Sequence, residues 1–66
     1  MESKLFISRR DYDRLIRNYQ QWSKTSLASM RKSWSLAGAV VIGTSEQIAE
    51  VRDKLHGLAD CDAMLD

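Results

Sequence analysis

The sequence contains no proline and no long apolar run. Without proline, no position forces a helix to break. The longest uninterrupted apolar stretch, residues 36–42, is far shorter than the roughly 20 residues that a membrane-spanning helix needs. No stretch resembles a secretory signal, so we expect a cytoplasmic protein.

A single cysteine, Cys61, and a single histidine, His56, exclude two common ways of stabilising a short chain. One cysteine cannot form a disulfide within the chain, and one histidine argues against a dedicated zinc site. The 66 residues form at most one small domain, residues 1–66, whose own core is marginal. Oligomerisation is the remaining route, and we therefore expect a homodimer.

No group of residues has the spacing of a catalytic or metal-binding motif. The cluster of His56, Asp60, Cys61 and Asp62 matches no zinc or calcium pattern. A separation of five positions does not bring the side chains of His56 and Cys61 face to face as a nucleophile and its base. We expect neither an enzyme nor a protein with a bound cofactor.

Charge is divided unevenly along the chain. Residues 1–37 hold eight Lys/Arg and three acids, whereas residues 38–66 hold two Lys/Arg and six acids. Residues 14–37 contain no acid at all. Cationic side chains recur here at helical spacing and are expected on one face as a partner-binding stripe: Arg10, Arg14, Arg17, Lys24 and Arg31.

Apolar residues follow the same helical period on the opposite side. They predict one long amphipathic helix over about residues 9–36, with Ser8 as its N-cap. The hydroxyl-rich segment 23–26 would also fit a break and a second helix start. The segments 4–7 and 39–43 would each fit a short strand, although the helical stripe also reaches Val41. These alternatives remain open at the level of sequence.

A shorter helix is predicted over about residues 45–58, because Thr44 and Gln47 have the spacing of a capping box. The predicted fold is therefore mainly α, a helical hairpin that dimerises, with residues 59–66 as an acidic tail that either frays or docks. Its core and dimer interface are expected to use the apolar stripes of both helices: Tyr12, Ile16, Tyr19, Met30, Trp34, Ile48, Val51 and Leu55.

These features favour a small regulatory protein that inhibits or adapts a larger protein by protein–protein interaction. The alternative is a nucleic-acid-binding transcriptional regulator of the ribbon–helix–helix type, in which residues 4–8 would pair across a dimer and enter the DNA major groove. Membrane association through the first helix is the least favoured hypothesis, because the middle of that helix is rich in hydroxyl groups.

Overall fold

The computed structural model is an α+β domain in which one antiparallel sheet carries helices. It describes the backbone of residues 2–65 and the side chains of residues 2–58. Along the chain the elements are β1 (Glu2–Ser8), α1 (Arg9–Asn18), α2 (Gln20–Trp22), the π-helical turn η1 (Ser23–Leu27), β2 (Arg31–Trp34), β3 (Gly38–Thr44) and α3 (Ser45–Leu65).

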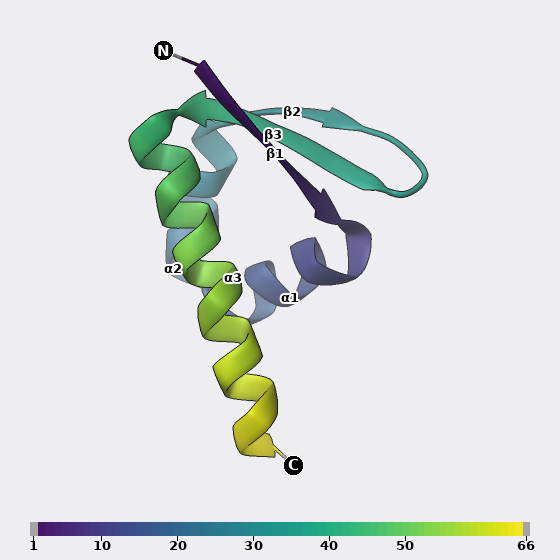
Figure 1. Ribbon diagram of the computed structural model, residues 1–66, viewed down its shortest axis with the longest axis vertical. Coiled ribbons are helices and arrows are strands. Elements are labelled where there is room, and N and C mark those ends of the chain that lie inside the picture. The colour runs from purple at the N-terminus through teal and green to yellow at the C-terminus, as the bar shows by residue number, and fades with distance from the viewer. Residues whose placement is uncertain (1, 66) are drawn as a thin grey trace.

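The sheet has the order β1-β3-β2, so the last strand in sequence lies in the centre (Figure 1). Both neighbours run antiparallel to β3, and Val41 lies opposite Leu5 on one side and Lys32 on the other. The central strand contains the β-branched run Val40–Ile42, whose side chains suit a pleated, packed surface. It is the only strand of the described part of the chain that is paired along both edges.

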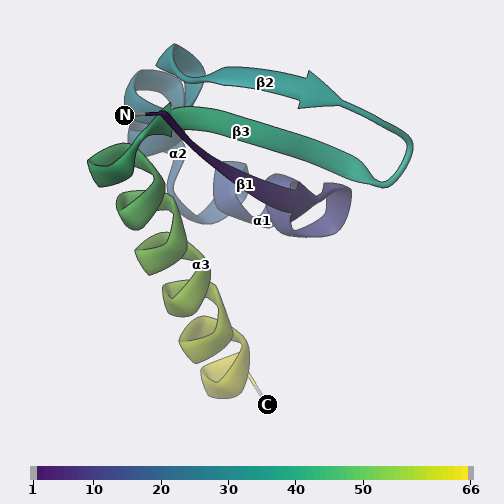
Figure 2. The same ribbon diagram turned by 45° about the horizontal axis from the view of Figure 1, so that its top comes forward.

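All helices lie against one face of the sheet, and the opposite face is uncovered (Figure 2). Side chains alternate accordingly: Ile7, Ala39 and Val41 point into the core, whereas Phe6, on the uncovered face, is 51% exposed. The helices supply the rest of a single apolar cluster, formed by Ile7, Leu15, Leu27, Met30, Val41, Ile48, Val51 and Leu58.

The prediction of a mainly α helical hairpin is wrong. The helix predicted over residues 9–36 is interrupted after Asn18, continues as the shorter helical elements α2 and η1, and gives way to strand β2 from Arg31. The two segments for which an extended conformation was left open, 4–7 and 39–43, both lie within strands. These strands provide the sheet that the continuous-helix interpretation excluded.

The first helix ends because the backbone of Tyr19 leaves the helical region, with φ −129° and ψ 60°. This change directs the phenol of Tyr19 at Gly57 of α3, where any added Cβ would collide with the hydroxyl oxygen. The ring also makes an edge contact with Trp22. A tertiary contact therefore ends the helix before the hydroxyl-rich segment in which the sequence would allow a break.

The hydroxyl-rich segment itself is helical but irregular. The hydroxyl of Ser23 donates to the carbonyl oxygen of Gln20 (3.0 Å), and that of Thr25 donates to Gln21 (3.0 Å). Such side-chain bonds compete for the carbonyls of a regular α-helix. The turn widens into the π-helical η1 over Ser23–Leu27.

Helix α3 begins where the capping box places it. The backbone N–H of Thr44 donates to Oε1 of Gln47 (2.9 Å), and the N–H of Gln47 donates to the Thr44 hydroxyl (3.1 Å). The helix then continues to Leu65, through most of the stretch predicted to fray or dock. The side chains of residues 59–65, and Asp66, lie outside the described residues.

Candidate protein-binding surface

A half-exposed tryptophan marks the edge of the helix-covered face. Trp34 lies opposite Ala39 in the pairing of β2 with β3, so its side chain points to the same side as the helices. Its ring packs edge-on against Tyr12 of α1, with ring centroids 4.8 Å apart. Burial raises the pKa of the Tyr12 phenol. Trp34 nevertheless remains 50% exposed.

Arg9 ties the β2–β3 connection to the start of α1. Its guanidinium lies 5.4 Å from the centroid of the Trp34 ring, within the range of a cation–π contact. The same group donates to the carbonyl oxygens of Ser35 (3.1 Å) and Leu36 (3.3 Å). The backbone N–H of Arg9 donates to Ala37 (3.3 Å). Four contacts from one residue therefore fix the shape of the hairpin tip.

This fixed tip presents an apolar side chain to solvent. Leu36 is 97% exposed, and the connection that holds it projects beyond the helices (Figure 2). Ile16 continues the apolar surface along α1, four residues after Tyr12 on the same flank, and is 41% exposed. We call this set the Trp34 surface: Arg9, Tyr12, Ile16, Trp34 and Leu36.

The elements that supply the Trp34 surface, α1 and β2, carry mostly positive charge. Lys32 precedes Trp34 by two residues on β2, and Arg10 and Arg17 are exposed on α1. Asp13 is the one exposed acid of the described part of α1, and the neighbouring Asp11 pairs with Arg14. From residue 14 to residue 45 the sequence contains no acid.

The five residues of the predicted cationic stripe do not share one face. Arg10, Arg17 and Lys24 are exposed, but α1 ends between the second and the third of them. Arg31 lies at the start of β2 and pairs with Glu2 across the uncovered face of the sheet (3.3 Å). The single stripe depended on a continuous helix, and it is lost with that helix.

Arg14 differs from the other four because it joins two helices. Its guanidinium pairs with Asp11 (3.3 Å) and donates to the carbonyl oxygen of Leu58 in α3 (3.4 Å). Its side chain is only 20% exposed. This geometry indicates a structural role.

Charge reversal should therefore affect stability differently at Arg14 and at Arg17. We expect Arg14→Glu to lower the free energy of unfolding by about 2 kcal/mol, since it breaks bonds to α3 and places a carboxylate beside Asp11. Arg17→Glu should change it by less than about 0.5 kcal/mol, because Arg17 is exposed. Urea unfolding followed by circular dichroism measures both values, and equal effects would contradict the structural role of Arg14.

The residues predicted for the core or dimer interface fall into three groups. Met30, Ile48 and Val51 are buried within the chain. Tyr12, Tyr19 and Leu55 are partly buried against the core. Ile16 and Trp34 are half exposed and belong to the Trp34 surface.

Sequence reasoning missed Arg9 and Leu36. Leu36 lies between Ser35 and Ala37, just before the glycine that begins β3, and a hairpin interpretation of residues 31–44 would have placed it at the tip. Arg9 gives no comparable signal, because its role arises from carbonyl groups that are 26 and 27 residues away in sequence.

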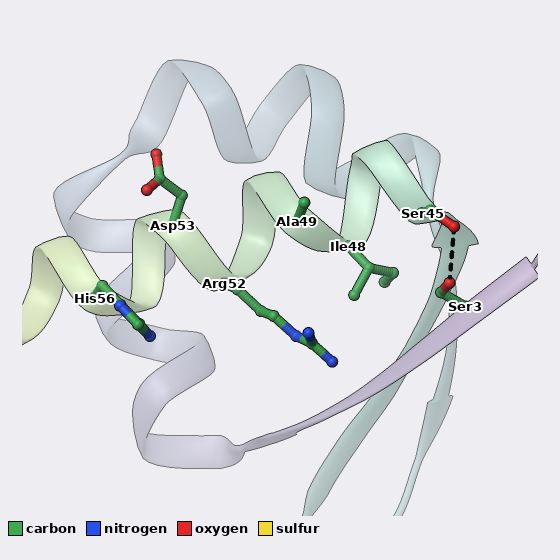
Figure 3. Close-up of a pocket in the computed structure, with 7 residues that line it drawn as sticks. All are labelled: Ser3, Ser45, Ile48, Ala49, Arg52, Asp53 and His56. Carbon is green, nitrogen blue, oxygen red and sulfur yellow. Dashed lines mark hydrogen bonds between the residues drawn. The ribbon is translucent and has the colours of Figure 1, made fainter.

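A second feature is a hollow between α3 and β1. It has a volume of about 660 Å³ and is lined by Ser3, Ser45, Ile48, Ala49, Arg52, Asp53 and His56. Arg52 and His56 extend from the same flank of α3 toward β1, and the hydroxyls of Ser3 and Ser45 lie 3.3 Å apart at its end (Figure 3).

No helix within the described residues combines the length and apolar content that crossing a membrane requires. No three side chains of His, Cys, Asp or Glu in the same part of the chain are grouped to hold a metal ion.

Comparison of the chain with family models, curated proteins and solved structures gave no match.

Proposed function

We propose that this protein is a non-enzymatic binding protein that regulates a larger protein by docking on an acidic patch of it through the Trp34 surface. The observation that carries the proposal is the half-exposed Trp34, which contacts Tyr12 and Arg9 of α1 and is followed two residues later by the exposed Leu36. Tryptophan, tyrosine and arginine are the residue types that dominate the energetic centres of protein interfaces.

The rigidity of the surface supports a docking role. Ordering a flexible loop at an interface costs free energy, and this cost is avoided where the loop is already held. The hairpin tip is fixed by Arg9 through bonds to Ser35, Leu36 and Ala37. Leu36 is thereby held in a fixed position, although the chain itself buries almost none of its side chain.

Charge complementarity supports an acidic partner. Arg9 belongs to the surface, and the same elements, α1 and β2, also carry Arg10, Arg17 and Lys32, whereas Asp13 is the exposed acid of α1. A cationic rim of this kind steers encounter with a negative patch and disfavours a basic one.

Single-stranded nucleic acid is the second candidate partner. Its support is the combination of an exposed tryptophan, on which a base can stack, with a stretch of 32 residues from 14 to 45 that contains no acid. The ribbon–helix–helix arrangement is not formed, because β1 pairs with β3 of its own chain and residues 31–34 are a strand.

Leu36 provides the test, since its replacement should leave the fold unchanged. The wild type, Leu36→Ser and the conservative control Leu36→Met are immobilised and exposed to a lysate of the source organism. An acidic protein should be retained by the wild type and by Leu36→Met, and should bind at least about tenfold more weakly to Leu36→Ser when purified and titrated. Equal retention by Leu36→Ser would contradict docking through this surface.

The nucleic-acid candidate is tested with a labelled single-stranded oligonucleotide and the wild type, Trp34→Ala and Leu36→Met. Binding measured by fluorescence anisotropy should weaken steeply with salt and should be lost in Trp34→Ala only. Absence of binding at low salt would remove this candidate.

A further inference from the structure

The outer edge of β1 is a backbone surface that no strand of the described residues pairs with. β1 is seven residues long and lies at one end of the order β1-β3-β2, so only its inner edge is hydrogen-bonded to β3. Such an edge exposes a row of N–H and C=O groups that can pair with another strand. The other edge strand, β2, is four residues long and begins with two consecutive cations, Arg31 and Lys32.

We propose that a second copy of this chain pairs with β1 through the same strand, which joins two three-stranded sheets into one sheet of six strands. The dimer does not rest on the proposed function, because Trp34 lies on β2, the strand at the opposite edge of the sheet from β1. A short chain with a marginal core gains from such a partner.

The strand is self-complementary in a register centred on Leu5, its middle residue. Two antiparallel copies keep their helices on the same side of the joined sheet only if residues of the same face lie opposite each other. Pairing centred on Leu5 satisfies this condition and uses all seven residues. It places Lys4 of each copy opposite Phe6 of the other, on the uncovered face. Pairing centred on Lys4 would instead place two ammonium groups opposite each other.

Side chains on both faces favour the Leu5-centred register. Phe6 is 51% exposed, and a lysine across from an aromatic ring makes a favourable cross-strand pair that occurs twice in the dimer. On the helix-covered face, Leu5 is only partly buried against the core and would meet Leu5 of the other copy. Apolar contact is thus available on one face and cation–π contact on the other.

The hollow between α3 and β1 supports the same arrangement. It opens beside the unpaired edge of β1, and its lining includes the buried side chain of Ile48 next to Ser3 of β1 (Figure 3). A partner strand seated along β1 would add a wall to this hollow. The flank of α3 facing it carries the small side chains of Ser45 and Ala49 and the exposed ones of Arg52 and His56, which can change rotamer as a strand approaches.

The test measures self-association of the full chain by sedimentation velocity, from about 1 to about 100 µM. The wild type should show a monomer–dimer equilibrium. Phe6→Lys should raise the dissociation constant about tenfold, because two like-charge pairs replace two favourable ones. The double variant Lys4→Glu/Phe6→Lys should restore association, since each introduced lysine then faces an introduced glutamate.

Both variants should fold, because Lys4 and Phe6 are exposed, and circular dichroism verifies this. Hydrogen exchange provides a second readout: the outward amides of β1 should become more protected as the protein concentration rises. A monomer at every concentration would overturn the proposal. So would a dimer that is indifferent to Phe6→Lys, or one that is disrupted by Leu36→Ser instead.

Discussion

Replacing Leu15 with alanine should destabilise the protein by about 3 kcal/mol, whereas replacing its neighbour Ile16 should cost less than about 1 kcal/mol. Leu15 has no exposed surface and lies in the centre of the apolar cluster, so its truncation leaves a cavity. Ile16 is 41% exposed at the Trp34 surface. The two changes lie on adjacent residues of the same helix and have the same chemistry, which makes each a control for the other.

Urea unfolding followed by tryptophan fluorescence and by circular dichroism measures both free energies. The pair also distinguishes the sheet-based fold from a continuous amphipathic helix, in which Ile16 lies at the centre of the apolar stripe and Leu15 lies beside it. If Ile16→Ala were the more costly change, the packing of α1 against β3 and α3 described above would be wrong.

Gly38→Ala should be comparably damaging, with a loss of about 3 kcal/mol. Gly38 begins β3 with φ +157°, opposite Ser8 at the end of β1. A Cβ at this position would collide with the carbonyl oxygen of Ile7 and would lie 2.8 Å from the Cα of Ser8. Both obstacles are backbone atoms of the neighbouring strand, so relief requires the two strands to separate.

Gly43→Ala is the matched control in the same strand. The Cβ added there would meet only the side chain of Gln47, whose far end can move. We expect a loss of about 1 kcal/mol, mainly from weakening of the cap that Gln47 makes with Thr44. Equal losses for the two glycines, measured by thermal unfolding, would contradict the close approach of β1 to Gly38.

Local signals in the sequence predicted the starts of helices well. The hydroxyl of Ser8 accepts from the N–H of Asp11 (3.2 Å) as an N-cap, and Thr44 and Gln47 form the capping box. These interactions join residues three positions apart, so a pattern in the sequence is sufficient to identify them.

Non-local pairing explains the failure over residues 31–34. Met30 and Trp34 are four residues apart, a spacing that fits one face of a helix. In the structure Trp34 lies opposite Ala39 in a hairpin, and β3 itself lies beside β1, which is more than 30 residues earlier in sequence. The periodicity of apolar residues describes one segment at a time. It therefore does not detect that both edges of β3 need a hydrogen-bonded partner strand.

The candidate site could not be predicted from the sequence for the same reason. Trp34 was expected in a core or dimer interface because it continues the apolar stripe of Tyr12 and Ile16. The structure brings Trp34 to Tyr12 from a different element, and only part of its ring is covered. The exposure of Leu36 follows from the hairpin, which the helical interpretation excluded.

The central position of β3 also has a consequence for how the chain is made. During synthesis, β1, α1 and β2 leave the ribosome before β3, and neither outer strand has a partner until residues 38–44 emerge. Two unpaired strands are then present on one nascent chain, and each is able to pair wrongly with a neighbouring chain. Closure of the sheet is thus a late event that depends on contacts distant in sequence, and it should set the folding rate of the whole domain.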